Sequence, residues 1–525
     1  MNQKVQTGPK SAAYTTDYKA GQDNVQVMGM DILNPVFGTS ALAILAFVVL
    51  ALIFPADAKE MLVGARTWSI ETFDWLFMIG GNVFVVFCIA LIFLPVGKIR
   101  LGGAQAKPEH SRMSWFSMLF AAGMGIGLMF WSVAEPVAYY TDWWGTPLNA
   151  AANTPEGASA AMGATMFHWG LHPWAIYGVV ALALAFFTYN KGLPLTIRSA
   201  FYPLLGERVW GPIGHVIDIV AVLATIFGLA TSLGLGASQA SGGLNFLFGI
   251  DNNISTQIGI IIAVSAIAIF SVIRGLDGGV KVLSNINMII AGVLLLFIVV
   301  AGSVTAFFGN FFGILTSYAS DIIPLSNWVG REDDKFYTGW TVFYWAWWVS
   351  WSPFVGMFIA RISKGRTVRE FMTAVLLIPT LVTAVWMAAF GGNALDQIQA
   401  GVGELTKGVG DVSLAMFHML ENLPLTEMTS ILAIVLVLVF FITSSDSGSL
   451  VIDSITAGGK VDAPVPQRIF WAVLQGTIAG VLLYGGGSEA LTALQAGAIT
   501  VGLPFTVVLL LMCVSLYKGL HSEVR

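Results

Sequence analysis

The chain has 525 residues, of which 56% are apolar and 10% are charged, and its formal net charge is −5 at pH 7. With a mean hydropathy of +0.78, this composition excludes a soluble globular protein and indicates an integral membrane protein, because each transmembrane helix needs about 20 mostly apolar residues. No nucleotide motif or long basic segment is present, so we expect no nucleic-acid partner. Cys88 and Cys513 lie in apolar segments and predict neither a disulfide nor a metal site.

Twelve apolar segments follow one another along the chain, and we expect each to form a transmembrane helix of an all-α membrane protein. The polar residues 1–34 lack the pattern of a signal peptide, so we expect the first span to be retained, and residues 517–525 form a short tail. The predicted spans are 35–55, 71–95, 113–133, 166–188, 212–240, 255–273, 280–308, 337–361, 371–391, 427–456, 467–485 and 489–516.

Basic residues concentrate on one side of this topology. Twenty Lys and Arg residues lie in the two tails and after the even-numbered spans, whereas five lie in the opposite loops. Because positive residues are enriched in cytoplasmic loops, we expect both termini to be cytoplasmic.

Two loops of this topology are more than short connectors. The loop 134–165, on the outer side, carries Glu135, Asp142 and Glu156 and no basic residue. The segment 309–330 is apolar and aromatic but is interrupted by glycine and proline, so we interpret it as an interfacial amphipathic helix that is useful for subunit contact.

The span 113–133 contains three alternating glycines, Gly123, Gly125 and Gly127. Small residues at this spacing usually form a packing groove for another helix, which is the favoured interpretation of the glycines alone. They also weaken the helix, and a break would free carbonyl groups for an ion, because irregular backbone at membrane depth must line a cavity or lie buried in protein.

The densest aromatic cluster is the run GWTVFYWAWWVSWSP at 339–353, which carries no charge and holds five tryptophans. Ring faces attract cations without a carboxylate, whereas tryptophan in membrane helices normally lies at the interfaces, so this density favours a binding site. Trp347 and Trp351 share one helix face, and Trp348 points about 100° away. Pro353 removes a helical N–H, and we expect it to break this span.

The two interrupted spans begin two blocks of five spans, 113–308 and 337–516. An odd number of spans makes the second block an inverted copy of the first. Interrupted helices at matching places of such halves indicate the midplane site of a transporter.

The span 166–188 begins with MFHWGLHPWAIY, which adds Trp169, Trp174 and Tyr177. Taken alone, these rings would be an interfacial belt. Together with the tryptophan run they favour one shared aromatic box.

Several polar groups fall inside predicted spans. His168 and His172 are four residues apart but have no third metal ligand nearby in sequence, so we interpret them as structural, hydrogen-bonded histidines. Asp218 and Asp446 are costly in lipid and must face protein or water. The sequence names no partner for Asp218, and Asp446 is as consistent with local capping as with function.

The span 427–456 ends in FFITSSDSGS, where Thr443 and Ser444 begin a series of neutral hydroxyl groups. Hydroxyl and carbonyl oxygens suit a hard monovalent cation such as sodium, although such side chains also bond back to their own helix. Thr225 and Thr231 are a weaker version of the same pattern.

The run GWTVFYWAWW at 339–348 resembles the signature of the betaine/choline/carnitine transporter family, and HWGLHPWAIY at 168–177 and ARISKGRTVREF at 360–371 extend the resemblance over nearly the whole chain. The resemblance implies a leucine-transporter-type fold, with a five-plus-five inverted repeat preceded by two extra helices at 35–95. It also implies a homotrimer in the bacterial inner membrane and a quaternary ammonium or similar zwitterion as substrate.

By this resemblance an aromatic box would hold the substrate, with Trp347 and Trp351 flanking the path and Phe354 as an inner gate. Backbone N–H groups of the broken span near Gly125 and Gly127 would meet a substrate carboxylate. The members of the box would be Trp169, Trp174, Tyr177 and Trp348.

The resemblance also implies sodium as the coupling ion. A second sodium site would involve Thr225 near Phe354, but Leu229 stands one turn on where a hydroxyl is expected, so its presence and the stoichiometry stay open. The first site would use the carbonyl oxygens of Ala121 and Met124 and the oxygens of Phe440, Thr443 and Ser444.

The expected function is sodium-coupled import of glycine betaine or a sulfonium analogue such as dimethylsulfoniopropionate. Gly127 and the motif WSPF at 351–354 favour a zwitterion, since proton-driven choline carriers of the family tend to have an acid at this glycine. The alternatives are sodium-independent exchange and a proton-coupled carrier of choline- or carnitine-like substrates.

We expect neither an enzyme, which would have only His168 and His172 for chemistry at the box, nor a channel. The short tail lacks the long basic segment of osmosensing members, so we expect regulation to differ or to be absent.

Overall fold

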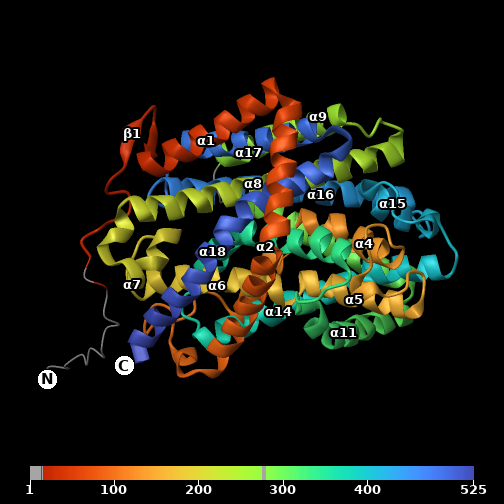
Figure 1. The fold of residues 1–525 in the computed structure, drawn as a ribbon, viewed down its shortest axis with the longest axis horizontal. Helices are drawn as coiled ribbons and strands as arrows, with labels where there is room; N and C mark the ends of the chain where they lie inside the picture. Colours follow the sequence, from red (N-terminus) through yellow and green to blue (C-terminus); the bar gives the residue numbers. More distant parts are fainter. Residues whose placement is uncertain (1–13, 15, 124, 275–279, 525) are drawn as a thin grey trace.

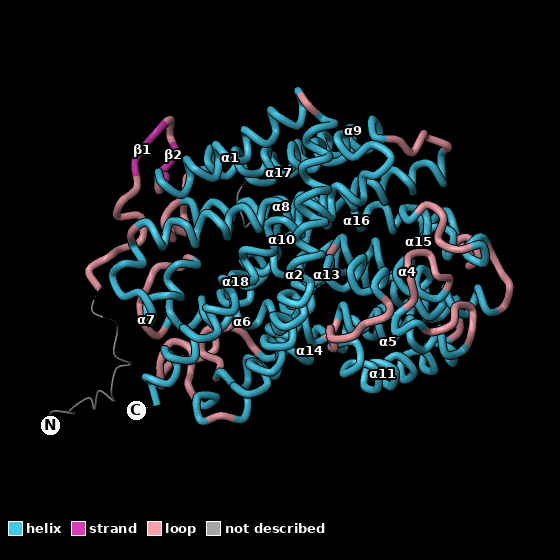
Figure 2. Tube along the Cα trace, in the orientation of Figure 1, coloured by secondary structure: helices cyan, strands magenta, loops and turns pink. Residues whose placement is uncertain are grey.

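The computed structural model describes Tyr14 and residues 16–123, 125–274 and 280–524, and nearly all of the regular structure in this part of the chain is helical (Figure 1, Figure 2). Strands β1 (Val25–Val27) and β2 (Met30–Ile32) pair as one short antiparallel hairpin. The long helices are α1 (Asn34–Ile53), α2 (Pro55–Phe93), α3 (Arg112–Gly123), α4 (Ile126–Tyr140), α5 (Pro155–Trp169), α6 (Leu171–Tyr189), α8 (Pro212–Phe248), α9 (Ile254–Arg274), α10 (Val280–Gly302), α11 (Val304–Ser326), α13 (Val342–Ile362), α14 (Val368–Gln399), α16 (Thr426–Thr456), α17 (Val465–Gly486) and α18 (Ala490–Val524).

The shorter elements lie in the connections between these helices. They are α7 (Tyr202–Leu205), α12 (Asp334–Phe336), α15 (Ala415–Leu420), the π-helical turn η5 (Tyr337–Thr341) and the 3-10 turns η1 (Pro95–Lys98), η2 (Pro147–Asn149), η3 (Ile197–Phe201), η4 (Gly206–Trp210), η6 (Glu404–Lys407), η7 (Val412–Leu414) and η8 (Gly487–Glu489).

Ten helical segments of the described residues, with α5 and α6 counted together, are long and apolar enough to cross a membrane. They confirm an all-α, multi-pass membrane protein. The other two predicted spans correspond to α3 with α4, which are separately too short, and to α13, whose tryptophans and serines lower its mean hydropathy. The topology of twelve helices and the inverted repeat stay predictions.

Several helices are longer than the apolar segments that predicted them. Helix α2 begins at Pro55 rather than 71, with non-helical backbone at Phe73. The predicted span 166–188 is not one helix, because it divides at Gly170 into the end of α5, which begins at Pro155, and α6, which ends at Tyr189. Helix α18 continues to Val524, so the predicted tail is helical up to that residue. Hydropathy detects the apolar centre of a helix but not the polar turns that extend it.

The predicted interfacial segment 309–330 corresponds to α11, which is continuous from Val304 and includes Pro324 near its end. The preceding span ends at Gly302 rather than 308, and Ser303 caps α11 by accepting a hydrogen bond from the N–H of Ala306. Helix α11 packs on α5 and α14. Its glycines therefore do not interrupt it.

The tryptophan-rich helix α13 lies near the centre of the bundle (Figure 2). It packs against α6, α8 and α18, and α16 packs against α8. Helix α2 crosses the bundle on one face and contacts α6, α14 and α18 (Figure 1). This arrangement buries α13 between helices of both halves of the chain.

Both ends of the described chain lie on the same side of the molecule. Lys191 Nζ lies 5.0 Å from the ring centroid of Tyr14 and forms an ion pair with Glu523. An even number of membrane crossings requires this placement, which agrees with the predicted topology. The cytoplasmic orientation of that side stays a prediction.

The intramembrane acids have partners that their sequence context does not reveal. Asp218 lies 3.3 Å from the Nε atom of Arg198 and accepts a hydrogen bond from the Thr196 hydroxyl at 3.0 Å. Asp446 accepts a hydrogen bond from Ser271 on α9 at 2.9 Å. Asp218 therefore contributes to the packing of the segment before α8.

Candidate functional site

The predicted span 113–133 is a broken helix. Helix α3 ends at Gly123 and α4 begins at Ile126, while Gly125 has an extended backbone with φ −165° and ψ −178°. Of the two interpretations of the glycines, the structure supports the interrupted helix. The first N–H groups of α4 have no carbonyl partner within their own helix, so they can meet a negative group.

The span that contains Pro353, by contrast, is continuous, so the expected break at this residue is wrong. Pro353 lies inside α13. Its missing N–H would have bonded to the Val349 carbonyl, and the hydroxyl of Ser352 donates to that carbonyl instead, at 2.7 Å. A serine next to the proline thus satisfies the freed group, which keeps the helix intact in a membrane.

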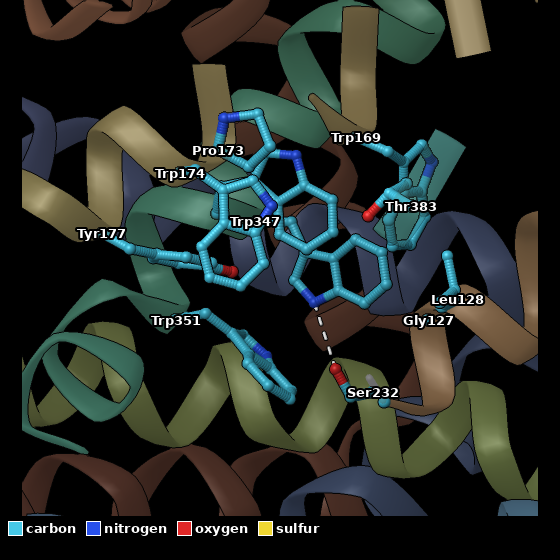
Figure 3. A pocket seen from close by; sticks show the side chains of 12 residues that line it. Gly127, Leu128, Trp169, Pro173, Trp174, Tyr177, Ser232, Trp347, Trp351 and Thr383 are labelled. Atoms are coloured by element: carbon cyan, nitrogen blue, oxygen red, sulfur yellow. Dashed lines mark hydrogen bonds between the residues drawn. The ribbon is translucent and has the colours of Figure 1, made fainter. Parts of the chain in front are cut away.

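An aromatic cavity lies where the break between α3 and α4 meets α5, α6, α8, α13 and α14 (Figure 3). The volume within it that the centre of a water molecule can occupy is about 40 Å³. None of the described residues that line it is charged. The lining residues are Gly125, Gly127, Leu128, Trp169, Pro173, Trp174, Tyr177, Ser232, Trp347, Trp348, Trp351 and Thr383.

The rings of this cavity meet at defined angles. Trp348 lies edge-on to Trp169, with ring centroids 4.8 Å apart and planes at 74°, and edge-on to Tyr177 at 6.2 Å and 82°. Trp174 meets Tyr177 in the same way, at 5.4 Å and 81°. Trp347 stacks on Trp348 at 4.9 Å with 13° between the planes. Rings from α5, α6 and α13 therefore form one continuous wall.

The indole N–H groups of the three α13 tryptophans that line the cavity donate to the surrounding helices, which fixes the orientation of each of these rings. Figure 3 shows one of these bonds, between Trp347 and Ser232. The donor–acceptor pairs are Trp347 Nε1 with Ser232 Oγ at 3.2 Å, Trp348 Nε1 with the His168 carbonyl at 2.9 Å, and Trp351 Nε1 with the Gly228 carbonyl at 2.9 Å.

The structure brings most of the predicted substrate residues together. The two glycines and all six aromatic residues of the predicted box and its flanks line the cavity, whereas Phe354 does not and instead contacts Trp351, with ring centroids 5.4 Å apart. Trp340 and Trp345 pack elsewhere, against Trp131 and His172 respectively. The roles of these residues in substrate binding stay predictions.

Gly127 allows two rings to approach the helix break closely. A Cβ atom at this position would lie 2.6 Å from Cη2 of Trp347 and 3.1 Å from Cη2 of Trp169. At Gly125, an added Cβ would meet no atom within 4 Å. Gly125 and Gly127 therefore differ: the first precedes and caps α4, and the second provides space for tryptophan.

The structure describes four of the five residues that are predicted to form the first sodium site. Met124 lies outside the described residues, and Ala121 lies in the last turns of α3. The hydroxyl of Thr443 donates to the Phe440 carbonyl within α16 at 3.2 Å, and Ser444 is buried beside it. Helix α16 packs against α4, which follows the break. The first sodium site stays a prediction.

The second predicted sodium site has less to support it. The hydroxyl of Thr225 donates to the Ala221 carbonyl of its own helix at 2.7 Å. Leu229 packs closely on α16, because a Cβ at Gly448 would lie 2.3 Å from the Cδ1 atom of Leu229. An apolar side chain thus fills the place where a hydroxyl was expected, and this site also stays a prediction.

The two histidines form hydrogen bonds, as predicted. His168 Nδ1 lies 2.8 Å from Glu135 Oε1, and its Nε2 lies 2.9 Å from the Thr341 hydroxyl. His172 Nε2 lies 3.1 Å from Asn82 Oδ1. The described residues contain no group of three potential ligands that could hold a metal ion.

Sequence reasoning missed several residues at the site. Ser232 and Thr383 line the cavity, but isolated hydroxyls in apolar helices carry no distinctive pattern. Glu135 was assigned to an outer loop, whereas residues 134–140 continue α4 and the Glu135 side chain is fully buried. The span was ended too early because its length was counted from 113, although the break at Gly125 starts a new helix.

The comparisons with known proteins identify the family of the chain. The family model of BCCT, the betaine/carnitine/choline family transporters, matches residues 35–525. The chain belongs to the BCCT family. Since this family consists of transporters, the expectation that the protein is not an enzyme is confirmed.

Individual relatives cover almost the whole chain. A glycine betaine transporter 1 of Vibrio parahaemolyticus is 64% identical over 97% of this chain and 98% of its own length. A glycine betaine/proline/choline/ectoine transporter of the same organism is 63% identical over 97% of this chain and 91% of its own. Among solved structures, a manganese transporter of Eremococcus coleocola covers 78% of this chain and 81% of its own at 14% identity, and its TM-score of 0.42 is too low to assign a shared fold.

Proposed function

We propose that this BCCT transporter is a secondary active symporter that imports glycine betaine, or a similar quaternary ammonium or sulfonium zwitterion, together with sodium by alternating access. The uncharged, ring-lined cavity carries the proposal. A trimethylammonium group cannot donate a conventional hydrogen bond, so ring faces and desolvation must bind it.

The break between α3 and α4 suits the negative end of such a zwitterion. Gly125, Gly127 and Leu128 line the cavity at the start of α4. The free N–H groups and the positive end of the helix dipole favour a carboxylate there. A zwitterion would thus place its cationic head among the rings and its carboxylate at the helix start.

The relatives named above support the same substrate class, because they match this chain at 63% and 64% identity over nearly its full length. The bacterial origin of these proteins supports a location in the bacterial inner membrane. Sodium binding at the α3–α4 break and α16, assembly as a homotrimer and cytoplasmic termini are further parts of the proposal.

Uptake by purified protein in proteoliposomes tests the proposal. We expect radiolabelled glycine betaine to accumulate when an inward sodium gradient is imposed and not when potassium replaces sodium. Uptake that is indifferent to sodium would contradict the symport and favour exchange, which preloading the vesicles with betaine would reveal. Uptake driven by a pH gradient alone would favour a proton-coupled carrier.

A further inference from the structure

A buried carboxylate lies directly behind the aromatic cavity. Glu135 on α4 has no exposed surface and is not among the residues that line the cavity. Its Oε1 atom lies 2.8 Å from both the Tyr139 hydroxyl and His168 Nδ1. Its Oε2 atom accepts hydrogen bonds from Trp169 Nε1 at 2.6 Å and from the Tyr344 hydroxyl at 2.5 Å.

Each oxygen of this carboxyl group has two hydrogen-bonding partners. A carboxylate offers about four lone-pair sites on its two oxygens, and each partner here carries a hydrogen that it can donate. The four contacts fix the orientation of the group and of the side chains that meet it. His168 Nδ1 lies within hydrogen-bonding distance of both Glu135 and the Tyr139 hydroxyl, and its Nε2 faces the hydroxyl of Thr341.

Two of the four donors connect the carboxylate to the cavity. Trp169 lines the cavity and meets Trp348 edge-on at 4.8 Å. Tyr344 does not line it, but its ring lies 5.8 Å from that of Trp348 and 24° from parallel. Both donors are held in place by a group that is not itself in contact with the cavity.

A hydrogen bond to a carboxylate also changes the ring that donates it. The negative charge pushes electron density from the N–H or O–H group into the ring, which makes the ring face more negative. A cation is attracted to that face by its negative quadrupole, so the attraction increases. The low dielectric of a buried site leaves this effect, and the direct attraction of the charge, weakly screened.

We propose that Glu135 is a positioning and specificity-determining residue of the substrate site, which orients Trp169 and Tyr344 and, through these rings, strengthens binding of a cationic head group. This inference rests on the proposed function. It explains how a cavity without a charged lining prefers a cation over an uncharged group of the same shape.

A pair of ligands that differ only in the head-group charge tests the inference. Glycine betaine and tert-butylacetate have the same shape and carboxylate, but a carbon replaces the cationic nitrogen in the second. We would measure betaine affinity by tryptophan fluorescence and tert-butylacetate affinity by competition, in detergent-solubilised wild type and in Glu135→Gln. The ratio of the two affinities reports the preference for the charge.

We expect Glu135→Gln to lower this ratio about tenfold and Glu135→Asp, which keeps the charge, to lower it less. Tyr139→Phe is the matched control, because it removes one hydrogen bond to the same carboxylate but changes no ring of the cavity. We expect it to leave the ratio within about twofold of wild type.

The result that would overturn the inference is an unchanged ratio in Glu135→Gln, whether both affinities fall equally or neither changes, because a merely structural carboxylate would act on both ligands alike. If Glu135→Gln fails to fold, Tyr344→Phe keeps the charge and the ring but removes one link between them, and we expect a fall in the ratio of about threefold. An unchanged ratio there would refute action through Tyr344.

Absence of betaine binding by the wild type would instead refute the proposed function, and the inference with it.

Discussion

The two spans that carry the sequence signals of an interrupted helix behave differently. The first separates into α3 and α4 around the extended Gly125. The second runs as α13 through Pro353, and the Ser352 hydroxyl bonds the Val349 carbonyl that the proline leaves without a backbone donor. The backbone at Gly125, by contrast, leaves the helical conformation. Free carbonyls and N–H groups for ligands are therefore expected at the glycines and not at the proline.

The two sides of the cavity contribute different groups. Helix α13 contributes rings, and the α3–α4 break contributes backbone groups. Replacing a ring of α13 should have the largest effect. We expect Trp348→Leu to weaken betaine binding at least about 100-fold, because both the cation–π attraction and the buried ring are lost. Betaine-dependent tryptophan quenching measures this loss.

Trp345→Leu is a matched control for that variant, because Trp345 lies on the same helix but packs on His172 outside the cavity. We expect it to keep the wild-type affinity once folding is verified. Unchanged quenching in Trp348→Leu would refute the aromatic box.

The proposed sodium site lies between the α3–α4 break and α16, and its α16 side can be tested by substitution. We expect Thr443→Ala combined with Ser444→Ala to raise the sodium concentration for half-maximal uptake about 30-fold, because two oxygen ligands are lost. Sodium titration of betaine uptake measures this change. Ser449→Ala is the control, since that hydroxyl bonds the Asp446 carbonyl of its own helix at 2.8 Å. An unaltered sodium requirement in the double variant would exclude this site.

The two glycines of the break can be separated experimentally. We expect Gly127→Ala to lower betaine affinity about tenfold, because the added Cβ would overlap Trp347 and force the ring to move. Gly125→Ala should change the affinity less than about twofold, because nothing lies within 4 Å of the added atom and an extended backbone suits any residue. Equal effects of the two substitutions would contradict the close approach of the rings to Gly127.

The continuity of α13 leads to the smallest expected effect. Ser352→Ala should destabilise the protein by about 1–2 kcal/mol, because the Val349 carbonyl loses the hydroxyl that bonds it. Thermal unfolding in detergent measures this change. The same substitution in a Pro353→Ala background should cost little, because an alanine at 353 restores the N–H. A loss of the same size in both backgrounds would show that the serine does not compensate for the proline.

The sequence predicts those parts of the molecule that depend on composition and local spacing. Apolar segments indicate membrane helices, and the aromatic runs near Trp169 and Trp348 indicate one box because rings of this density have few other uses in a membrane. The glycines of the span 113–133 indicated the break only as the second interpretation, after a packing groove.

The remaining features depend on contacts between distant residues. The Ser352 hydroxyl supplies the Val349 carbonyl with the donor that Pro353 lacks, and no propensity scale contains this bond. Glu135 carries no motif, and its four partners lie on α4, α5 and α13. Only the fold shows that an acid after an apparent span end is buried behind the rings.

The π-helical turn Tyr337–Thr341 directly precedes α13, so it affects how α13 can be aligned with a helix of another protein or grafted into one. A π turn holds one residue more than an α-helical turn, so it offsets the phase of everything that follows by about 100°. Deleting one residue there would turn Trp348 away from Trp169 without changing any residue of the cavity. An alignment or a graft of this helix therefore has to treat residues 337–341 as the site of a single-residue insertion.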